Sequence, residues 1–337
     1  MGIKYFLKVT LYQNIPMSSI SEKSSTLTKF LFSSQTIVIT GLVWGVLALL
    51  FFLLFSVPLP GEELPTWYSV GTYIFELGAY LIATIICFRN WQSPQMVSGR
   101  NVWMGISLGL LFYFMAGVVF GCWELIWELD PDVSLADIFY VFSYIFLGWG
   151  MTVAITSKRL NLEVWQWGVL VAVAVGGIIL AIFVNDSSFF GLLSTPDATA
   201  LKEVDIIEIE EVSASLAPSW VIALDEKLEP FSEVLNLFYI IADVFLLIIA
   251  TALLLAFWGG RFSQSWRMIA AATFSLYIAD MYFKWADAQI TGEYESGGLL
   301  EVFFVFTAIL FGIGAVLEYD ISTRSRQSRR SRRSSSS

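Results

Sequence analysis

The segment LADIFYVFSYIFLGWG, residues 135–150, recurs in altered form as LLEVFFVFTAILFGIG, residues 299–314. The two segments align without a gap. In both, an acidic residue near the start, Asp137 or Glu301, precedes an aromatic and apolar run that ends in Gly-x-Gly. Acidic residues are rare in apolar helices, so their match indicates an internal repeat rather than shared composition. The identical pairs include Phe139/Phe303, Val141/Val305, Phe142/Phe306, Ile145/Ile309, Gly148/Gly312 and Gly150/Gly314.

Long apolar runs dominate the rest of the chain. Hydrophobic residues make up 57% of the sequence and charged residues 14%, with a mean hydropathy of +0.71. Soluble domains carry about a quarter charged residues. We therefore predict an all-α polytopic integral membrane protein with eight transmembrane helices, each about 20 residues long. The expected spans are residues 35–57, 67–88, 102–124, 135–156, 164–184, 233–257, 267–288 and 299–318.

The repeat divides the expected spans into two halves of four helices. Glu76, followed by LIAT, matches Asp243, followed by IIAT, so the similarity extends beyond the quoted segments. Because four is an even number, both halves enter the membrane in the same direction, which predicts parallel repeats about an axis along the membrane normal. The expected parts are a basic, serine-rich arm (1–34), repeat 1 (35–156), repeat 2 (157–318) with an acidic outer loop (185–232), and a tail (319–337).

Lysine and arginine are distributed unevenly between the expected loops. Apart from Lys202, Lys227 and Lys284, they lie on the side that holds both termini. The loops on the other side are acidic, among them GEELP at 61–65 and TGEYESGG at 291–298. Cytoplasmic loops are enriched in lysine and arginine. We therefore predict a cell-membrane protein with both termini in the cytoplasm and the acidic loops outside.

The composition excludes several kinds of chemistry. The chain has no histidine and a net charge of −10. It therefore lacks the imidazole of zinc, haem and serine–histidine sites, and the basic face that nucleic-acid binding requires. We expect no cofactor, no metal, no nucleic-acid partner and no enzymatic activity. Cys87 and Cys122 fall near opposite ends of neighbouring spans, too far apart to form a disulfide.

Ionisable residues inside the expected spans form the candidate site. A charge in hydrocarbon is costly, so such residues pair with one another or face a water-filled cavity. These residues all fall in the outer parts of their helices, which predicts an outward-facing polar cavity that binds a ligand between the repeats. The candidate ligand-binding residues are Glu76, Asp243, Asp280, Lys284, Asp137 and Glu301, and the expected aromatic walls are Trp67, Tyr73, Tyr113, Tyr140, Tyr277 and Trp285.

Lys284 is the single lysine within an expected span, and two acidic residues lie close to it in the sequence. Asp280, Lys284 and Asp287 follow the spacing i, i+4, i+7 and share one helix face, so either carboxylate can neutralise the lysine. A second interpretation assigns these residues no ligand. In it, acids near the rim such as Asp137 and Glu301 reach interfacial water, and tryptophans near span ends anchor the helices in the membrane.

Three segments together resemble a known kind of membrane module. They are WELDPDVSLADIFYVFSYIFLGWG (127–150), FYIIADVFLLIIATALLL (238–255) and SLYIADMYF (275–283). They are similar to the multi-span, sensor-type N-terminal modules of bacterial diguanylate cyclases, phosphodiesterases and histidine kinases. The resemblance implies a ligand-responsive module of about eight helices. Residues 319–337 are too few for an output domain, so the expected signalling or complex subunit is a separate cytoplasmic protein.

The C-terminal tail differs in composition from the spans. Residues 322–337, STRSRQSRRSRRSSSS, contain no apolar side chain that could form a core, so we predict a disordered segment. Its arginines favour contact with anionic lipid at the cytoplasmic surface. The lipid bilayer is therefore the main expected partner.

Three other functions remain open at this point. A small-solute or ion transporter fits parallel repeats with buried carboxylates, although no proline interrupts the middle of a span. A retinal-binding protein is suggested by the Asp280-x-x-x-Lys284 spacing. An intramembrane aspartyl protease is suggested by Asp243 and Asp280, each within Ile-Ala-Asp on consecutive spans, because such enzymes need two facing carboxylates.

Overall fold

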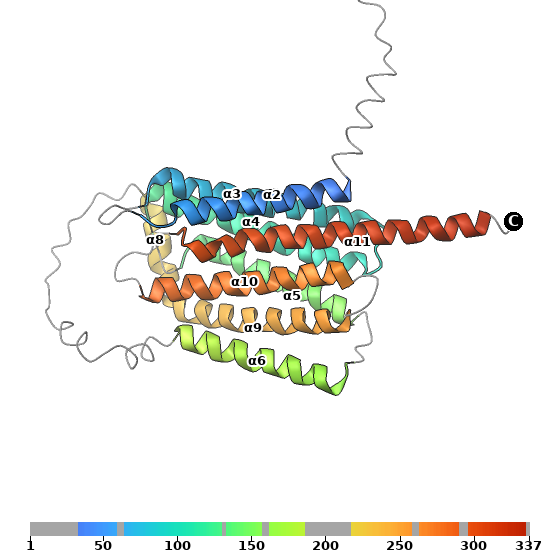
Figure 1. Ribbon diagram of the computed structural model, residues 1–337. Helices are drawn as coiled ribbons and strands as arrows, with labels where there is room; N and C mark the ends of the chain where they lie inside the picture. Colours follow the sequence, from blue (N-terminus) through green and yellow to red (C-terminus); the bar gives the residue numbers. More distant parts are fainter. Residues whose placement is uncertain are drawn as a thin grey trace, which may run out of the picture.

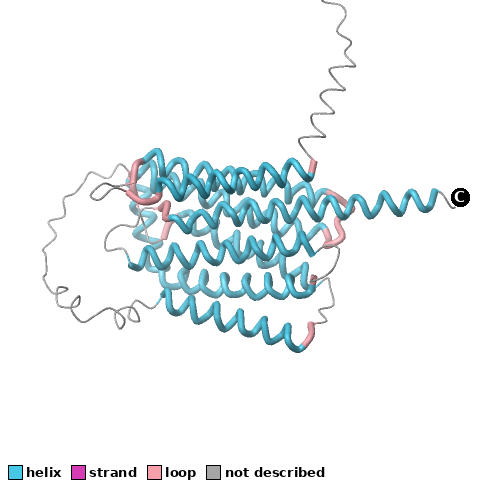
Figure 2. Tube along the Cα trace, in the orientation of Figure 1, coloured by secondary structure: helices cyan, strands magenta, loops and turns pink. Residues whose placement is uncertain are grey.

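In the computed structural model, long α-helices lie side by side in one bundle (Figure 1). The structure describes residues 33–58, 64–129, 133–156, 162–185, 217–257, 263–289 and 296–334. Every regular element within these ranges is helical (Figure 2). The long helices are α2 (Ser34–Phe55), α3 (Thr66–Gln92), α4 (Arg100–Trp127), α5 (Leu135–Thr156), α6 (Val164–Asn185), α9 (Ser232–Ala256), α10 (Ser263–Gln289) and α11 (Val302–Ser334); the short ones are α8 (Ser219–Leu228), η2 (Glu229–Phe231) and η3 (Leu299–Glu301).

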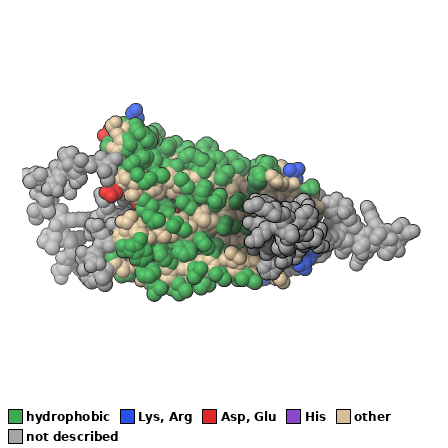
Figure 3. All heavy atoms as spheres, turned by 90° about the horizontal axis from the view of Figure 1, so that it is seen from above, with side chains coloured by type: hydrophobic (Ala, Val, Ile, Leu, Met, Phe, Trp, Pro, Cys, Tyr) green, Lys and Arg blue, Asp and Glu red, His purple; other side chains and the backbone are tan. Residues whose placement is uncertain are grey.

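The long helices are those of a membrane protein. Within the described ranges, seven segments are long and apolar enough to cross a membrane. The remaining long helix, α10, has a similar length but carries Asp280 and Lys284. Hydrophobic side chains cover the flank of the bundle, whereas the charged side chains visible in Figure 3 lie at its ends. Leu54 and Ile39 of α2 are 70% and 60% exposed. An apolar flank of this kind faces lipid, so the chain is a multi-pass membrane protein.

The helix contacts follow a regular order within and between the two halves of the chain. In the first half α3 packs against α4, and α4 against α5; in the second half α9 packs against α10, and α10 against α11. The halves meet where α5 packs against α9 and where α11 packs against α3 and α2. Trp103 and Tyr80 of the first half and Trp266 of the second lie in one core cluster and are at most 1% exposed.

Glycines allow the closest helix contacts. A Cβ atom at Gly105 of α4 would lie 2.5 Å from the Cα of Gly150 in α5, so the two backbones touch directly. Gly314 of α11 packs in a similar way on α10, where Ser265 Oγ donates a hydrogen bond of 2.7 Å to the Gly314 carbonyl. Both contacts involve the Gly-x-Gly endings of the repeated segments, which is why small residues are needed there.

The part of the predicted outer loop that precedes α9 is an ordered helix. α8 lies across one end of the bundle (Figure 1). Its Trp220 packs against Trp123 and Trp127 of α4, and the Trp123 indole donates to the Asp225 carboxylate at 3.1 Å. This short helix therefore covers the same end of the bundle as the loops before α3 and α5. Residues 1–32 of the predicted arm and 186–216 of the predicted loop lie outside the described residues.

The last helix is longer than the sequence indicates. α11 continues without a break to Ser334, so it includes most of the tail for which we predict disorder. The i, i+4 ion pair between Arg324 and Asp320, at 3.0 Å, stabilises the first turns beyond the span. Arginine also has a high intrinsic helix propensity, which composition-based prediction of disorder does not weigh.

Candidate functional site

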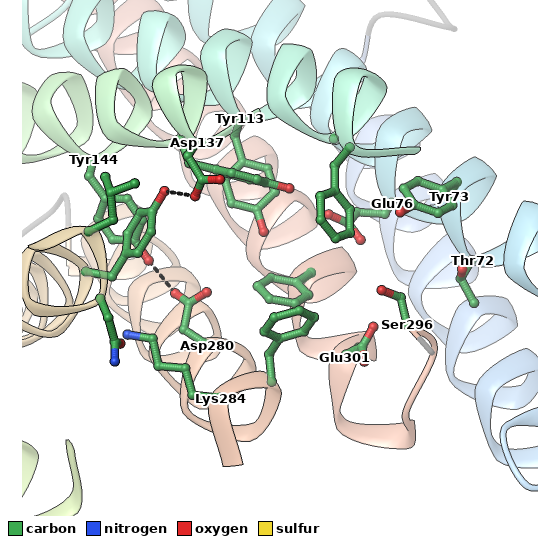
Figure 4. Close-up of a pocket in the computed structure, with 18 of the residues that line it drawn as sticks. Thr72, Tyr73, Glu76, Tyr113, Asp137, Tyr144, Asp280, Lys284, Ser296 and Glu301 are labelled. Atoms are coloured by element: carbon green, nitrogen blue, oxygen red, sulfur yellow. Dashed lines mark hydrogen bonds between the residues drawn. The ribbon is translucent and has the colours of Figure 1, made fainter. Parts of the chain in front are cut away.

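A cavity of about 480 Å³ lies inside the half of the bundle that carries the acidic loops. Its wall includes residues from the start of α3, α5 and α9 and from the end of α10, all of which meet at this end (Figures 1, 4). Of the six candidate residues, Asp243 alone is absent from the wall, and it lies directly behind it. The five in the wall are Glu76, Asp137, Asp280, Lys284 and Glu301.

Two of the predicted acids meet at one tyrosine. The Tyr144 hydroxyl of α5 lies 2.7 Å from Asp243 Oδ1 of α9 and 2.5 Å from Asp280 Oδ2 of α10. Asp243 is 2% exposed, so its carboxyl group is enclosed by protein. The tyrosine therefore joins the first half of the chain to two consecutive helices of the second.

Lys284 pairs with a different acid from the two expected. Its Nζ lies 3.8 Å from Asp243 Oδ2, and no ion pair within 4.0 Å joins it to Asp280 among the described residues. The prediction from spacing on one helix face is thus wrong for Asp280, because α9 packs against α10 and brings Asp243 opposite the lysine. The side chain of Asp287 lies outside the described residues. The Lys284 ammonium also lies 5.7 Å from the centre of the Tyr239 ring.

Asp137 and Glu301 each accept a hydrogen bond from the backbone at the start of their own helix. Asp137 Oδ2 accepts a hydrogen bond of 2.8 Å from the Ser134 backbone N–H, three residues earlier. Glu301 Oε1 accepts one of 3.1 Å from the Gly298 N–H, also three residues earlier. These are the carboxylate contacts of a capping box. Both acids line the cavity, but each has a local structural role that the sequence did not indicate.

Unlike Asp137, Asp280 and Glu301, Glu76 is a wall carboxylate without a hydrogen-bond partner among the described residues. It points into the cavity from α3 (Figure 4), and none of the described residues donates a hydrogen bond to it. By contrast, Glu124 of α4, close by, accepts hydrogen bonds from the Tyr73 hydroxyl and from the Ser296 backbone N–H at 3.1 Å. Glu76 is therefore the acid best placed to bind a ligand.

The aromatic wall agrees with the sequence in part. Tyr73, Tyr113 and Tyr140 line the cavity as expected. Trp67 and Trp285 lie away from the cavity and are 54% and 39% exposed, as membrane anchors would be. The Tyr277 hydroxyl donates to the Gly177 carbonyl of α6 at 2.7 Å, so this tyrosine joins α10 to α6 and does not line the cavity.

Tyr144 and Tyr239 are the functional candidates that sequence reasoning missed. The Tyr239 hydroxyl donates to Asp137 Oδ1 at 2.6 Å. Tyr144 follows Asp137 by seven residues and Tyr239 precedes Asp243 by four, so each shares a helix face with a predicted acid. That spacing could have identified both. The chain matches no protein-family model, no curated protein and no solved structure.

Proposed function

We propose that this protein is a ligand-responsive membrane module, and that the acidic cavity binds a small organic cation. The observation that carries the proposal is the cavity itself. Its volume of about 480 Å³ falls within the range of small-molecule sites, and it collects the scattered intramembrane acids in one place. The sensor-type modules that the sequence resembles act through ligand-induced changes, and we assign the same kind of role to this chain.

The charges in the wall favour a cationic ligand. The wall holds Lys284 as its only positive side chain among the described residues, against the carboxylates of Glu76, Asp137, Glu233 and Glu301. Lys284 is already paired with Asp243. A positively charged ligand would thus meet an excess of negative charge, with Glu76 available for direct contact.

Aromatic rings in the same wall favour an organic cation over a metal ion. The Tyr113 ring stacks on Tyr80 at 4.1 Å, forms an edge contact with Tyr140 at 5.1 Å and lies tilted against Phe304 at 6.0 Å. Ring faces attract ammonium groups, and their apolar surface suits a hydrocarbon body. Among the described residues no group of three or more acids and thiols has the geometry to hold a metal.

We propose that the bundle consists of two parallel repeats of four helices, residues 35–156 and 157–318. Three observations support this. Asp137 and Glu301 cap their helices through the same contact. Gly150 and Gly314 sit at equivalent close contacts. The α5–α9 contact also has its counterpart in α11–α3. The cavity then lies between the repeats.

We further propose a location in the cell membrane with both termini in the cytoplasm. Arg89, Arg100, Arg267 and Arg324 lie at the end of the bundle opposite the cavity, as expected for a cytoplasmic end. The arginine-rich end of α11 would contact anionic lipid and a separate cytoplasmic signalling or complex subunit. The cavity then opens to the outside.

Binding of three compounds of similar size and different charge tests the proposed ligand class. Isothermal titration calorimetry on the purified protein compares benzylamine, benzyl alcohol and benzoate, which are cationic, neutral and anionic. We expect benzylamine to bind most tightly and benzoate not to bind. Glu76→Gln should weaken benzylamine binding by about tenfold, which is the effect of about 1.4 kcal/mol.

A matched substitution distinguishes the effect of a charge in the cavity wall from the effect of the net charge of the protein. Glu226→Gln makes the same change on an exposed position of α8, away from the cavity wall, and should leave benzylamine affinity unchanged. Equal affinity for benzylamine and benzoate, or equal loss in both variants, would refute the proposed ligand class.

Transport of a small solute is the second candidate function. The observation that favours it is that Tyr144, from the first half, contacts Asp243 and Asp280 from the second. Transporter sites commonly lie at such an interface between repeats. Uptake of labelled benzylamine into liposomes would distinguish transport from binding, because a sensor module binds the compound without moving it across the membrane.

A further inference from the structure

The hydrogen-bond geometry around Tyr144 constrains the position of one proton. Its hydroxyl oxygen is 2.7 Å from Asp243 Oδ1 and 2.5 Å from Asp280 Oδ2. A tyrosine hydroxyl has a single hydrogen to donate, and an ionised carboxylate can only accept. One of these two short contacts therefore lacks a hydrogen unless one of the carboxyl groups supplies it.

The position of Lys284 identifies which acid is ionised. Its Nζ is 3.8 Å from Asp243 Oδ2, and both of these buried atoms lack a hydrogen-bond partner. A buried ammonium is stabilised by an adjacent negative charge, so Asp243 carries that charge. If Asp280 were also ionised, two carboxylates joined through one hydroxyl group would repel each other, with one ammonium group to balance them, which is unfavourable.

We propose that the Asp243–Tyr144–Asp280 cluster is a proton-binding site, in which Asp280 holds the proton. The protonated Asp280 carboxyl group donates to the Tyr144 hydroxyl oxygen, and the Tyr144 hydroxyl donates to the Asp243 carboxylate. Each of the two short contacts then contains one hydrogen. The cluster, counted with Lys284, has no net charge.

Acidic and tyrosine side chains from several helices surround the cluster. The titratable side chains around this region come from α3, α4, α5, α9, α10 and η3. They are Glu76 and Tyr80 of α3, Tyr113 of α4, Asp137, Tyr140 and Tyr144 of α5, Tyr239 and Asp243 of α9, Tyr277 and Lys284 of α10, and Glu301 of η3.

Infrared spectroscopy detects a protonated carboxyl group without any ligand. We expect the purified wild-type protein to show a C=O stretching band of a carboxylic acid that shifts in heavy water. The band should be lost in Asp280→Asn, in which an amide replaces the neutral acid and can still donate to Tyr144. Asp225→Asn removes a carboxylate outside the cavity, bonded to Trp123, and should leave the band unchanged.

A second variant keeps the test decisive if Asp280→Asn does not fold. Tyr144→Phe removes the acceptor of the Asp280 hydrogen, so the band should move to higher frequency. An identical band in wild type and Asp280→Asn, or an unshifted band in Tyr144→Phe, would overturn the proposal. Because no ligand is present, either result is independent of benzylamine binding.

Discussion

Asp243→Ala is expected to lower the free energy of unfolding by about 3–5 kcal/mol, the usual cost of removing one partner of a buried ion pair. The Asp243 side chain is 1% exposed and lies 3.8 Å from the Lys284 ammonium. Without it, Lys284 would be left as a charge inside the bundle without its counterion, and the Tyr144 hydroxyl would lose one of its two partners. Denaturation of the purified protein in detergent measures the change.

Two comparisons test whether the buried charge causes this loss. Adding Lys284→Met removes the unpaired ammonium, so the double variant should recover a large part of the stability lost in Asp243→Ala. Asp320→Ala breaks the exposed pair with Arg324, where solvent screening limits the effect to below about 1 kcal/mol. Equal losses in Asp243→Ala and Asp320→Ala would show that the buried ion pair does not stabilise the fold.

Gly105→Ala is expected to destabilise the protein by about 3 kcal/mol, the upper end of the usual range for overpacking. The added methyl group would lie 2.5 Å from Gly150 Cα and 2.7 Å from its backbone nitrogen. Because these neighbours are main-chain atoms, no change of side-chain rotamer can relieve the contact. The α4 and α5 helices would have to move apart, and the same denaturation measurement detects the loss.

The control is a glycine in a helix with open space beside it. A Cβ atom at Gly176 of α6 would meet nothing within 4 Å among the described residues. Alanine favours helix over glycine by up to about 1 kcal/mol, so Gly176→Ala should leave stability unchanged or raise it. A loss of stability in Gly176→Ala equal to that in Gly105→Ala would contradict the assigned α4–α5 contact.

The helices were predictable because membrane spans are defined by local sequence. The expected span 135–156 coincides with α5 (Leu135–Thr156), and the other expected spans overlap the long helices. The sequence left open whether the acidic loop 185–232 is ordered, because its residues show no clear helical period. α8 (Ser219–Leu228) lies within this loop and buries Val221 against α4. α11 continues beyond Ile321, the last apolar residue, where composition predicted disorder.

The sequence predicted which acidic residues form the site, but it did not predict which of them pairs with Lys284. Intramembrane charge identified the acids, because each one requires a polar environment. The partner of Lys284 depends instead on which helices are neighbours, and the spacing within α10 contains no information about Asp243 in α9. The roles of Asp137 and Glu301 as helix caps were also missed. Each acid lies three residues after Ser134 or Gly298. This spacing occurs at many helix starts, so by itself it does not show that the acid contacts the backbone.

The acidic cavity is proposed to open to the outside and to select cations, and the reactivity of a thiol placed in its wall measures both properties. Asn236→Cys places a thiol in the wall of the cavity at the start of α9, in a background with Cys87→Ala and Cys122→Ala. Intact cells are treated with membrane-impermeant methanethiosulfonates, one carrying a trimethylammonium group and one a sulfonate. Val97→Cys, on an exposed position at the opposite end of the bundle, serves as the control.

The decisive quantity is the labelling rate of the thiol at position 236, divided by the rate of each reagent with a small thiol in solution. We expect the thiol at position 236 to be labelled in intact cells, faster with the cationic reagent, and more slowly in the presence of benzylamine. The control at position 97 should react only after the cells are permeabilised. Labelling at position 236 only after permeabilisation would show that the cavity does not open to the outside, and equal normalised rates for the two reagents would show that it does not select cations.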